Sequence, residues 1–545
     1  MKLFSVSIKI KNHKYILEYS LIFISFFIGF ISHAQTPTIG LRFIDPNVSD
    51  GYTLFTPEKN NSVYLINNCG EKVNEWTFTE LPGATCYLLE NGTLLRAGKQ
   101  ALEIRDWSNN VIWSYLLETI GLGQHHDIEP LPNGNILTVI SDFYSQDAIT
   151  SEGRNPATTT LQNFKLDKIV EIHPIGSNDA SVVWEWKFKD HLIQDFDNTK
   201  SNYGVVIDHP ELIDINFDNN QNKDYTHVNA VDYNAALDQI LISSRHLSEI
   251  YIIDHSTTTA EAAGHTGGNS NIGGDLLWRW GNPQVYKQAN NQKLFLQHDS
   301  KWVEPGYLDA GKVTVFNNDA DGTGMFSSIV LITPDINNGI YIKGRNIFKP
   351  ADYEWSWNGS FLGRIVQESK KSGTHQLPNG NFIISEAQIG QVSEITKSGT
   401  QLWTYKNPSG PSIINQFEDP ILNNIFFRAE KYPSTYIGFT GKNMTPQGII
   451  EDQNTLSSAC AASLSVKKSE LGVGLILNPI KNNTIQFVKN INFNSLNIID
   501  LNGRTIYKHG PFNGNNLKIN LIPGMYFVKL QFDNKIEILK IIIQH

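Results

Sequence analysis

The stretch that decides the fold is Leu131-Pro132-Asn133-Gly134-Asn135-Ile136-Leu137. Similar stretches stand at Leu89-Glu90-Asn91-Gly92-Thr93-Leu94-Leu95 and at Leu377-Pro378-Asn379-Gly380-Asn381-Phe382-Ile383. An Asn-Gly pair between two apolar runs is the strongest short signal for a β-hairpin, because both turn residues must accept a positive φ. Helical periodicity is scarce along the chain. The sequence therefore predicts a series of short antiparallel strands.

A second motif recurs beside these turns: an apolar run that ends in tryptophan. Its copies end at Trp76, Trp113, Trp184 and Trp186, Trp278 and Trp280, Trp355, and Trp403. Repeats of roughly 40 to 50 residues, each built from four strands, are the signature of a β-propeller. Six copies predict six blades, with insertions in the wider gaps. We expect the tryptophans to pack the blades rather than to bind a substrate.

Length and charge limit the class of protein. With 545 residues the chain is too long for one ordinary core, so several domains or one repeat array are expected. The formal net charge is -10. An acidic chain without a basic stripe is not expected to bind nucleic acid.

The N-terminus has the composition of an export signal. Four lysines precede a short apolar run, Leu21 to Ile31, which ends before small residues. This pattern predicts a secretory signal peptide over residues 1–34. No later segment is apolar enough to span a membrane, so we expect no transmembrane segment in the mature chain. The propeller is expected over residues 35–454.

The C-terminal region predicts a separate module. A small-residue linker, residues 455–465, leads to residues 466–545, where alternating strands and tight turns predict a small β-sandwich. Its Asn-Pro start, its Asp-x-Asn-Gly-Arg turn at Asp500 and its Gly-x-Tyr-x-Val strand at Gly524 resemble the C-terminal sorting domain of the type IX secretion system of Bacteroidetes. The resemblance implies the type IX machinery as a partner and a secreted or cell-surface location.

The three cysteines leave two possibilities open. Export into an oxidising space makes a Cys69–Cys86 disulfide possible, with Cys460 left over. Three unpaired thiols are equally compatible with the sequence. No spacing typical of a zinc site is present.

Four histidines stand at or near the start of strands that open the predicted hairpins: His126, His227, His298 and His375. Because a propeller places the first strand of each blade against the central channel, these side chains could meet there. However, His126 lies seven residues before Asn133, whereas His375 lies four residues before Asn379. The difference is odd and side chains alternate along a strand, so the two histidines cannot share one orientation without a bulge.

Several histidines in one channel are compatible with more than one chemistry. A metal site is one alternative, since neutral imidazole is the commonest ligand, although no His-Glu-x-x-His spacing is present. Transfer of an anionic group through a histidine nucleophile is another. One imidazole would attack, a protonated one would stabilise oxygen charge, and a third would protonate a departing phenolate. Neither a cofactor nor a metal ion is required for this second chemistry.

Six further stretches carry a family resemblance. They are Thr226–Tyr233, Asp238–His246, Gln297–Asp299, Val315–Asn318, Ser372–Asn381 and Phe427–Pro433. Together they resemble the arylsulfate sulfotransferase family, β-propeller enzymes that move sulfuryl groups between phenols without the nucleotide donor PAPS. The resemblance implies a ping-pong reaction. A histidine takes the sulfuryl group from an aryl sulfate, releases a phenol, and passes the group from a sulfohistidine intermediate to a second phenol.

The order of these stretches implies roles for single residues. His375 corresponds to the sulfated histidine, and His227 and His298 correspond to its catalytic partners. The implied substrate-binding residues are His126, Arg245, Asn317 and Asn318. One departure stands out: the family usually has an arginine shortly after the Phe-Asp-Asn stretch, and residues 316–324 contain none. Arg245, Arg345 or Arg364 would have to replace it. The missing arginine favours the alternative function, a non-catalytic secreted propeller that binds aromatic or sulfated ligands at the cell surface.

Two acidic loops raise the possibility of calcium. Asp214, Asn216 and Asp218 alternate like the ligands of a calcium loop that ends at Asp224, but the usual glycine and glutamate are missing. A shorter acidic turn follows Asp319. We expect solvated turns at both places and no metal ion in the active site. The overall prediction is an all-β chain, a six-bladed β-propeller followed by a small C-terminal β-sandwich.

Overall fold

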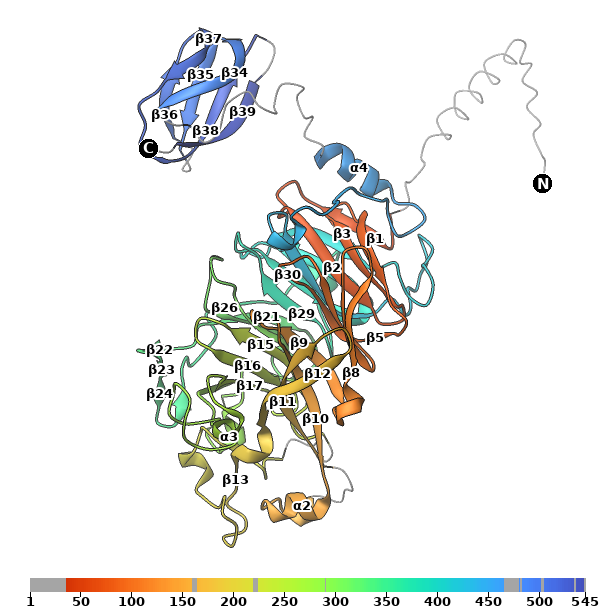
Figure 1. The fold of residues 1–545 in the computed structure, drawn as a ribbon, viewed down its shortest axis with the longest axis vertical. Coiled ribbons are helices and arrows are strands. Elements are labelled where there is room, and N and C mark those ends of the chain that lie inside the picture. Colours follow the sequence, from red (N-terminus) through yellow and green to blue (C-terminus); the bar gives the residue numbers. More distant parts are fainter. Residues whose placement is uncertain are drawn as a thin grey trace, which may run out of the picture. The chain divides into compact units, whose positions relative to one another are not determined.

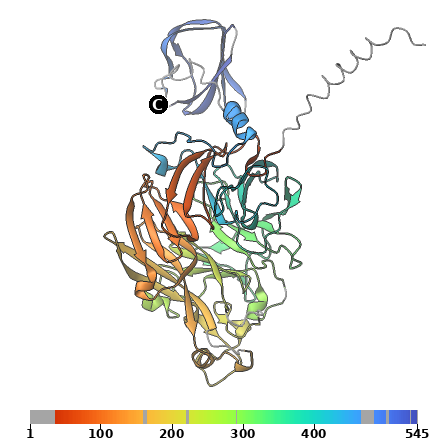
Figure 2. The same ribbon diagram turned by 90° about the vertical axis from the view of Figure 1, so that its right-hand side faces the viewer.

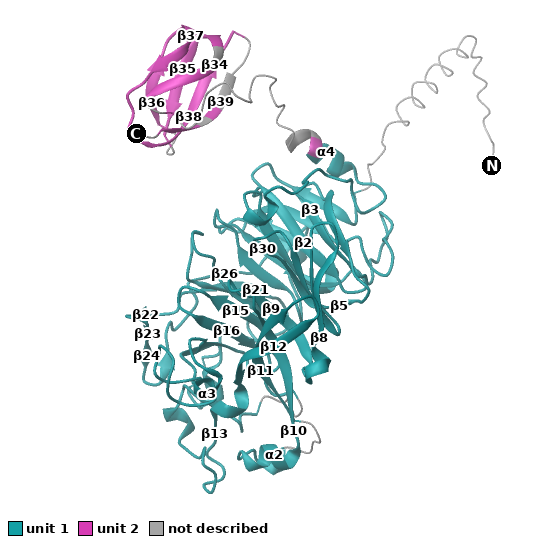
Figure 3. Cartoon of the chain, viewed as in Figure 1, with its two compact units in different colours: residues 1–460 teal, residues 461–545 magenta. Residues whose placement is uncertain are grey.

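The computed structural model describes residues 36–158, 164–218, 224–289, 291–464, 480, 483–500, 504–533 and 536–543. The chain divides into two compact units, residues 1–460 and 461–545 (Figure 3). The predicted signal peptide lies outside the described residues. Among the helices that are described, none is both long and apolar enough to cross a membrane.

The described part of the first unit contains six antiparallel sheets of four or five strands (Figure 1). The first sheet has the order β33 (Phe426–Pro433), β2 (Gly51–Pro57), β3 (Ser62–Asn67), β4 (Lys72–Thr77). The second has the order β5 (Pro82–Leu88), β6 (Leu94–Gly98), β7 (Ala101–Arg105), β8 (Val111–Leu116). The third has the order β9 (Gln124–Pro130), β10 (Ile136–Tyr144), β11 (Phe164–Ile175), β12 (Asp179–Lys187).

The remaining three sheets follow the same plan. The fourth has the order β15 (Val228–Asn234), β16 (Gln239–Ser244), β17 (Glu249–Asp254), β18 (Trp278–Trp280). The fifth has the order β19 (His298–Trp302), β20 (Val313–Asn317), β21 (Ser328–Ile332), β26 (Trp355–Trp357). The sixth has the order β29 (Gly373–Gln376), β30 (Phe382–Glu386), β31 (Gln391–Ile395), β32 (Gln401–Lys406), β1 (Gly40–Ile44).

The first strand of each sheet contacts the first strands of its two neighbours, in the cyclic order β33, β5, β9, β15, β19, β29 and back to β33. This closed ring of innermost strands is the arrangement of a β-propeller, and six sheets of the described residues take part in it. The two ends of the unit close the ring. Strand β33 pairs with β2, and β1 pairs with β32, so red N-terminal strands lie beside strands from near residue 400 in Figure 2.

The two sequence motifs explain the blades. In the Asn-Gly turns, Gly92, Gly134 and Gly380 have φ values of 77°, 86° and 86°, which glycine adopts without strain. The tryptophans connect neighbouring blades through hydrogen bonds of 2.7–2.8 Å from the indole Nε1 to a main-chain carbonyl. The pairs are Trp76 to Asp106, Trp113 to Asp179, Trp186 to Gly274, Trp278 to Lys349, and Trp403 to Asn68. The tryptophans therefore pack the blades, as expected.

The disulfide differs from both possibilities that the sequence left open. Cys69 pairs with Cys460 and Cys86 is a buried free thiol, so neither a Cys69–Cys86 disulfide nor three unpaired thiols is correct. The reason is that Cys86 lies on β5 among the apolar side chains around Trp76, whereas Cys69 lies in another cluster together with Cys460. The segment predicted as a linker forms helix α4 (Thr455–Leu464), and Ser457 Oγ on it donates to the Cys69 carbonyl at 2.8 Å.

The second unit is a two-sheet structure, which agrees with the predicted β-sandwich. One sheet has the order β36 (Thr505–His509), β35 (Ser495–Ile499), β38 (Gly524–Gln531), β39 (Ile536–Ile543). The other pairs β34 (Thr484–Phe493) with β37 (Phe512–Lys518). Apolar side chains such as Phe493, Leu496 and Val528 form its own buried core.

Candidate active site

The innermost strands carry charged side chains in the centre of the ring. On three of them the same order recurs along the chain: an aromatic ring, then an ionisable side chain, then, two residues beyond it, a second ionisable side chain. The three sets are His126, Asp127 and Glu129 on β9, then His298, Asp299 and Lys301 on β19, and Phe427, Arg428 and Glu430 on β33. Because these strands run in the same direction around the ring, the channel has two chemically different ends with a layer of ionised groups between them.

Three of the four predicted histidines lie together at the end where the innermost strands begin. The ring centroids of His126 and His227 are 4.7 Å apart. The ring of Phe427 lies 5.9 Å from that of His126 and 6.4 Å from that of His298. We call His126, His227 and His298 the histidine cluster. The structure therefore brings these three side chains into one site around Phe427.

His298 is held in one tautomer. Its Nδ1 lies 2.7 Å from Asn318 Oδ1, and the Asn318 amide nitrogen donates to the carbonyls of Glu368 and Lys371. An amide oxygen only accepts, so the proton is on Nδ1 of His298 and the lone pair is on Nε2. This lone pair accepts the Lys371 N–H at 3.1 Å. Burial lowers the pKa of His298 to about 3, so its imidazole is neutral at pH 7.

His227 is paired with a carboxylate. Its Nδ1 forms a short hydrogen bond with Asp224, which also accepts from Lys165 Nζ at 2.8 Å. Burial by itself would raise the pKa of Asp224, but the contacts with His227 and Lys165 outweigh it and hold that pKa well below its ordinary value. Among the hydrogen bonds of the described residues, His227 Nε2 takes part in none. This nitrogen is therefore available to a ligand.

His126 stands at the end of a second chain of polar groups. Its Nδ1 lies 2.6 Å from Nδ1 of His125, whose Nε2 lies 2.9 Å from the buried carboxylate of Asp167. Burial raises the pKa of Asp167, but His125 and Lys165 lower it to about 2, so this carboxylate is ionised. Burial also holds the pKa of His126 well below its ordinary value. His126 is thus a neutral imidazole positioned through its Nδ1.

The other predicted substrate-binding residues take different places. Arg245 lies at the cluster, with Nη1 2.8 Å from His246 Nε2, and its charge contributes to the lowered pKa of His298. Asn318 orients His298, as described above. Asn317 instead binds main-chain groups of Lys293 and Phe295 and holds the loop before β19. Arg345 and Arg364 are exposed, and Arg364 pairs with Glu386, so neither lies with the cluster.

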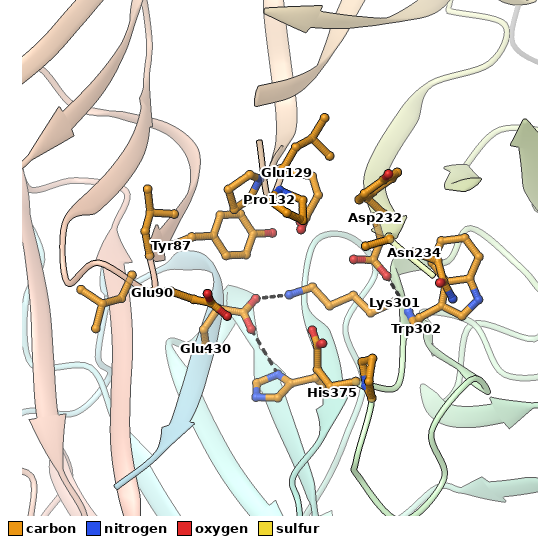
Figure 4. A pocket seen from close by; sticks show the side chains of 18 of the residues that line it. Tyr87, Glu90, Glu129, Pro132, Asp232, Asn234, Lys301, Trp302, His375 and Glu430 are labelled. Carbon is orange, nitrogen blue, oxygen red and sulfur yellow. Dashed lines mark hydrogen bonds and ion pairs between the residues drawn. The ribbon is translucent and has the colours of Figure 1, made fainter. Parts of the chain in front are cut away.

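His375 lies at the opposite end of the channel, where it lines a cavity of about 980 Å³ (Figure 4). Its Nε2 accepts the Lys431 N–H at 3.1 Å, and its Nδ1 lies 3.6 Å from Glu430. Burial lowers the pKa of His375 to about 4. The cavity is lined by five carboxyl groups and two lysines, and we call it the acidic pocket; these residues are Glu90, Glu129, Asp232, Glu304, Glu430, Lys301 and Lys431. The structure does not bring His375 together with the histidine cluster.

A buried ionic layer separates the two ends. Arg428 forms ion pairs of 2.7 Å with both Asp127 and Asp299. Two residues further along the same strands, Lys301 Nζ lies 2.5 Å from Glu430. Arg428, Asp127 and Asp299 are nearly inaccessible to solvent, and the two carboxylates raise the pKa of Arg428 above its ordinary value although burial opposes them.

The strand register explains why His375 and His126 differ. His375 pairs with Ile383, four residues after Asn379, and Glu129 pairs with Leu137, four residues after Asn133. His375 therefore occupies the position of Glu129, three residues beyond that of His126. A bulge in β9 and the positive φ of 60° at His126 turn the latter toward the cluster.

Sequence reasoning missed several residues of the channel. Arg428, Asp299 and Glu430 lay within the stretches that carry the resemblance, and a signal was present, because charged residues interrupt otherwise buried strands there. Asp167 gave no comparable signal, since it becomes a neighbour of the histidines only through the fold. The first acidic loop ends at Asp224, which lies three residues before His227 and pairs with it in the site. Asp319 and Asp321 accept main-chain N–H groups of their own turn, and residues 219–223 of the other loop lie outside the described residues.

Two family models match the chain. The model described as Arylsulfotransferase (ASST) matches residues 58–358, which include His126, His227, Arg245 and His298 but not His375 or Arg428. The model described as Secretion system C-terminal sorting domain matches residues 478–544. This type IX sorting domain indicates export and a cell-surface or secreted location. No curated protein matches the chain.

Several solved structures resemble the fold at low identity. A protein of unknown function from Bacteroides caccae has 12% identity and a TM-score of 0.39, over 70% of this chain and 99% of that one. A streptogramin B lyase has 11% identity and a TM-score of 0.33, over 73% and 92%. A putative 6-phosphogluconolactonase from Bacteroides fragilis has 8% identity and a TM-score of 0.36, over 71% and 99%. These likenesses carry no functional argument. The match to residues 58–358 covers more than half of the chain, and the chain therefore belongs to the arylsulfotransferase (ASST) family.

Proposed function

We propose that the chain is an aryl-sulfate sulfotransferase that needs no nucleotide donor and works at the histidine cluster. The observation that carries this proposal is that His126 and His298 both contact Phe427 while His227 contacts His126, with Arg245 nearby. The imidazoles and the guanidinium can bind sulfate oxygens, and Phe427 offers a surface for an aryl group. The substrates are an aryl sulfate donor and a phenol acceptor.

The charge of the two channel ends supports this location. A sulfate ester is an anion, so it needs a cation that is not already paired. The cations that line the acidic pocket, Lys301 and Lys431, are paired with Glu430 and Glu394. The histidine cluster instead has Arg245, which forms no ion pair with a carboxylate among the described residues. We therefore assign the reaction to the cluster and give His375 no part in it.

Within the cluster, His298 is the proposed nucleophile. Asn318 fixes its proton on Nδ1 and cannot take that proton away, so the imidazole stays neutral with its lone pair on Nε2. The aryl sulfate displaces the Lys371 N–H that occupies Nε2 in this structure. Arg245 binds the sulfate oxygens, and His126, held by His125, lies against Phe427 at the aryl group.

His227 and Asp224 are the proposed acid–base pair. Asp224 orients the ring through Nδ1, as a carboxylate does for the histidine of a catalytic triad, which leaves Nε2 to give and take protons. In the first half-reaction Nε2 of His298 attacks sulfur, the bond from sulfur to the aryl oxygen breaks, and the departing phenolate takes a proton from His227. In the second, His227 removes the proton of the acceptor phenol, the phenol oxygen attacks sulfur, and the nitrogen–sulfur bond breaks.

The experiment that tests this mechanism traps the intermediate. Full-length protein is mixed with 4-nitrophenyl sulfate in the absence of an acceptor, digested without acid treatment, and mapped by mass spectrometry. We expect one equivalent of nitrophenol and one sulfuryl group on the peptide that contains His298. A sulfuryl group on the peptide of His375 would refute the assignment to the cluster. Nitrophenol release without any labelled peptide would refute the ping-pong mechanism.

A binding propeller is the second candidate function. It is favoured by the hydrogen bond from Lys371 N–H to His298 Nε2, because a lone pair engaged in this way cannot attack sulfur. Such a protein would bind 4-nitrophenyl sulfate in equilibrium dialysis without releasing nitrophenol, whether or not phenol is present. Phenol-dependent release from wild-type protein excludes this candidate.

A further inference from the structure

A second group of histidines lies outside the channel, on the third and fourth sheets. His191 ends the 3-10 helix η3 (Phe188–His191), which follows β12. His265 and Asp275 belong to the segment that joins β17 to β18. One ligand atom from each of these three side chains lies within 4.8 Å of the other two. We propose that His191, His265 and Asp275 bind one divalent transition-metal ion of the zinc type.

The hydrogen bonds of His191 point to this role. Its Nε2 lies 2.8 Å from the carbonyl oxygen of Ala262, which only accepts, so this nitrogen carries a proton. Its Nδ1 lies 2.9 Å from Asp275 Oδ1, and Nδ1 of His265 lies 2.8 Å from the same oxygen. A histidine that ligates a metal through one nitrogen usually donates its other N–H to a carbonyl or carboxylate. His191 has this second-nitrogen contact already in place.

The surroundings fix the position of the first ligand. His191 is fully buried and stacks on Trp186, with ring centroids 5.3 Å apart and planes 7° apart. The main chain at Gly274 also packs closely against His191. A side chain at Gly274 would place its Cβ 2.0 Å from the Ala262 carbonyl oxygen and 2.7 Å from His191 Nε2, so the turn before Asp275 can pack here only with glycine. The ligand set is therefore preorganised on packed elements.

The chemistry of the donors selects the class of ion. Two imidazole nitrogens and one carboxylate oxygen suit zinc, which binds three protein ligands and a water molecule in a tetrahedron. Calcium and magnesium prefer oxygen ligands throughout. The side chain of His265 is 60% exposed, which leaves a path from solvent and room for the water ligand. Ligand atoms that lie 2.8–2.9 Å apart need to move apart by only a few tenths of an ångström to surround an ion at about 2.0–2.1 Å.

The bound ion would cross-link two neighbouring blades. His191 comes from the end of the third sheet, whereas His265 and Asp275 come from an insertion in the fourth, next to the Trp186–Gly274 hydrogen bond. The site lies apart from the histidine cluster, so its role is to hold the insertion in place rather than to take part in sulfuryl transfer.

The test is zinc binding by full-length protein, measured by equilibrium dialysis and metal analysis. His265→Ala removes an exposed ligand, and His209→Ala is the matched control, because His209 is also exposed and also contacts a carboxylate, Glu211. Asp224, His227 and His246 form another possible metal group, so the comparison rests on a difference in stoichiometry. We expect His265→Ala to bind one zinc ion fewer than both the wild type and His209→Ala.

Two further measurements make the result unambiguous. Cobalt(II) bound in place of zinc should give tetrahedral d–d absorption bands in wild type that lose one equivalent of intensity in His265→Ala. Zinc should raise the melting temperature of the wild type more than that of the variant. Equal stoichiometry in all three proteins, or no bound zinc in any of them, would overturn the proposal. If His265→Ala does not fold, as judged by circular dichroism, His265→Gln and Asp275→Asn are compared in the same way.

Discussion

The two ends of the channel are built from the same innermost strands and yet have opposite chemistry. At the start of β9 stands His126, and three residues later Glu129 faces the acidic pocket. His298 and Lys301 are separated by the same three residues on β19. A step of about 10 Å along a strand thus separates a site of imidazoles from a pocket lined mainly by carboxyl groups. The comparison teaches that the position of a histidine along its strand, rather than its presence in a recurring turn motif, decides which chemistry it can take part in.

The largest expected difference is in catalysis. His298→Ala should lower kcat/KM for 4-nitrophenyl sulfate with phenol by about 10³-fold or more, because the nucleophile is lost. The matched change at the other end, His375→Ala, should leave kcat/KM within about threefold of wild type. The measurement is the initial rate of nitrophenol release. A large loss in His375→Ala together with a small loss in His298→Ala would reverse the roles of the two ends.

The layer between the two ends should matter most for stability. Arg428→Met removes the only cation that both Asp127 and Asp299 contact among the described residues, and it leaves two carboxylates buried without a counter-charge. We expect the free energy of unfolding of the propeller to fall by about 3–5 kcal/mol. Urea denaturation followed by tryptophan fluorescence measures this change.

Arg345→Met is the control for that experiment. Arg345 is exposed, so its replacement should change the free energy of unfolding by no more than about 0.5 kcal/mol. Equal effects of the two substitutions would mean that the ionic layer does not stabilise the ring.

A matched pair of carboxylates tests the acid–base assignment. Asp224→Asn should lower kcat by about 10²-fold, since the amide no longer orients His227 for proton transfer. Asp232→Asn, in the acidic pocket, should leave kcat close to wild type. Comparable losses in the two variants would show that both ends of the channel serve the reaction.

The smallest effect is the pH dependence of stability, which has opposite signs at the two ends. The pKa of Asp232 is raised to about 7 by burial, so the folded state holds this proton more tightly than the unfolded chain and the stability falls as pH rises from about 4 to above 7. The pKa of His298 is lowered to about 3, so the unfolded chain binds the proton first and stability falls as pH drops from about 6.5 toward 3.

Urea midpoints measured across this pH range separate the two contributions. Asp232→Asn should reduce the loss of stability at alkaline pH by about 1 kcal/mol at pH 8. It should leave the loss of stability at acid pH unchanged. His298→Gln should do the reverse. If Asp232→Asn changes only the acid side, the carboxyl group does not carry a raised pKa.

Much of the fold could be predicted from local sequence. The Asn-Gly turns set the hairpins, the recurring tryptophans mark the contacts between blades, and the odd spacing of His126 and His375 indicates that these two histidines cannot share one orientation without a bulge. The order of the stretches that carry the family resemblance nevertheless suggested His375 as the nucleophile. Order along the chain follows the succession of blades, whereas the depth of a side chain in the channel depends on register and on the bulge in β9.

The remaining features depend on contacts between distant segments. Arg428 meets Asp127 and Asp299 only because β33 returns to pair with β2, and nothing near Arg428 in the sequence indicates those partners. The pairing of Cys69 with Cys460 likewise spans 391 residues and depends on where helix α4 packs. Local sequence patterns predict the secondary-structure elements and their buried faces. They do not predict which distant segments pair with each other to close the ring of sheets.

The same disulfide has a consequence for the life of the exported protein. Both of its cysteines lie within residues 1–460, and the compact unit with the sorting domain begins at residue 461. Proteolysis beyond Cys460 therefore detaches the sorting domain without breaking the covalent link between the first blade and the end of the propeller. The covalent link that closes the propeller and the attachment of the sorting domain are thus separate properties of the chain.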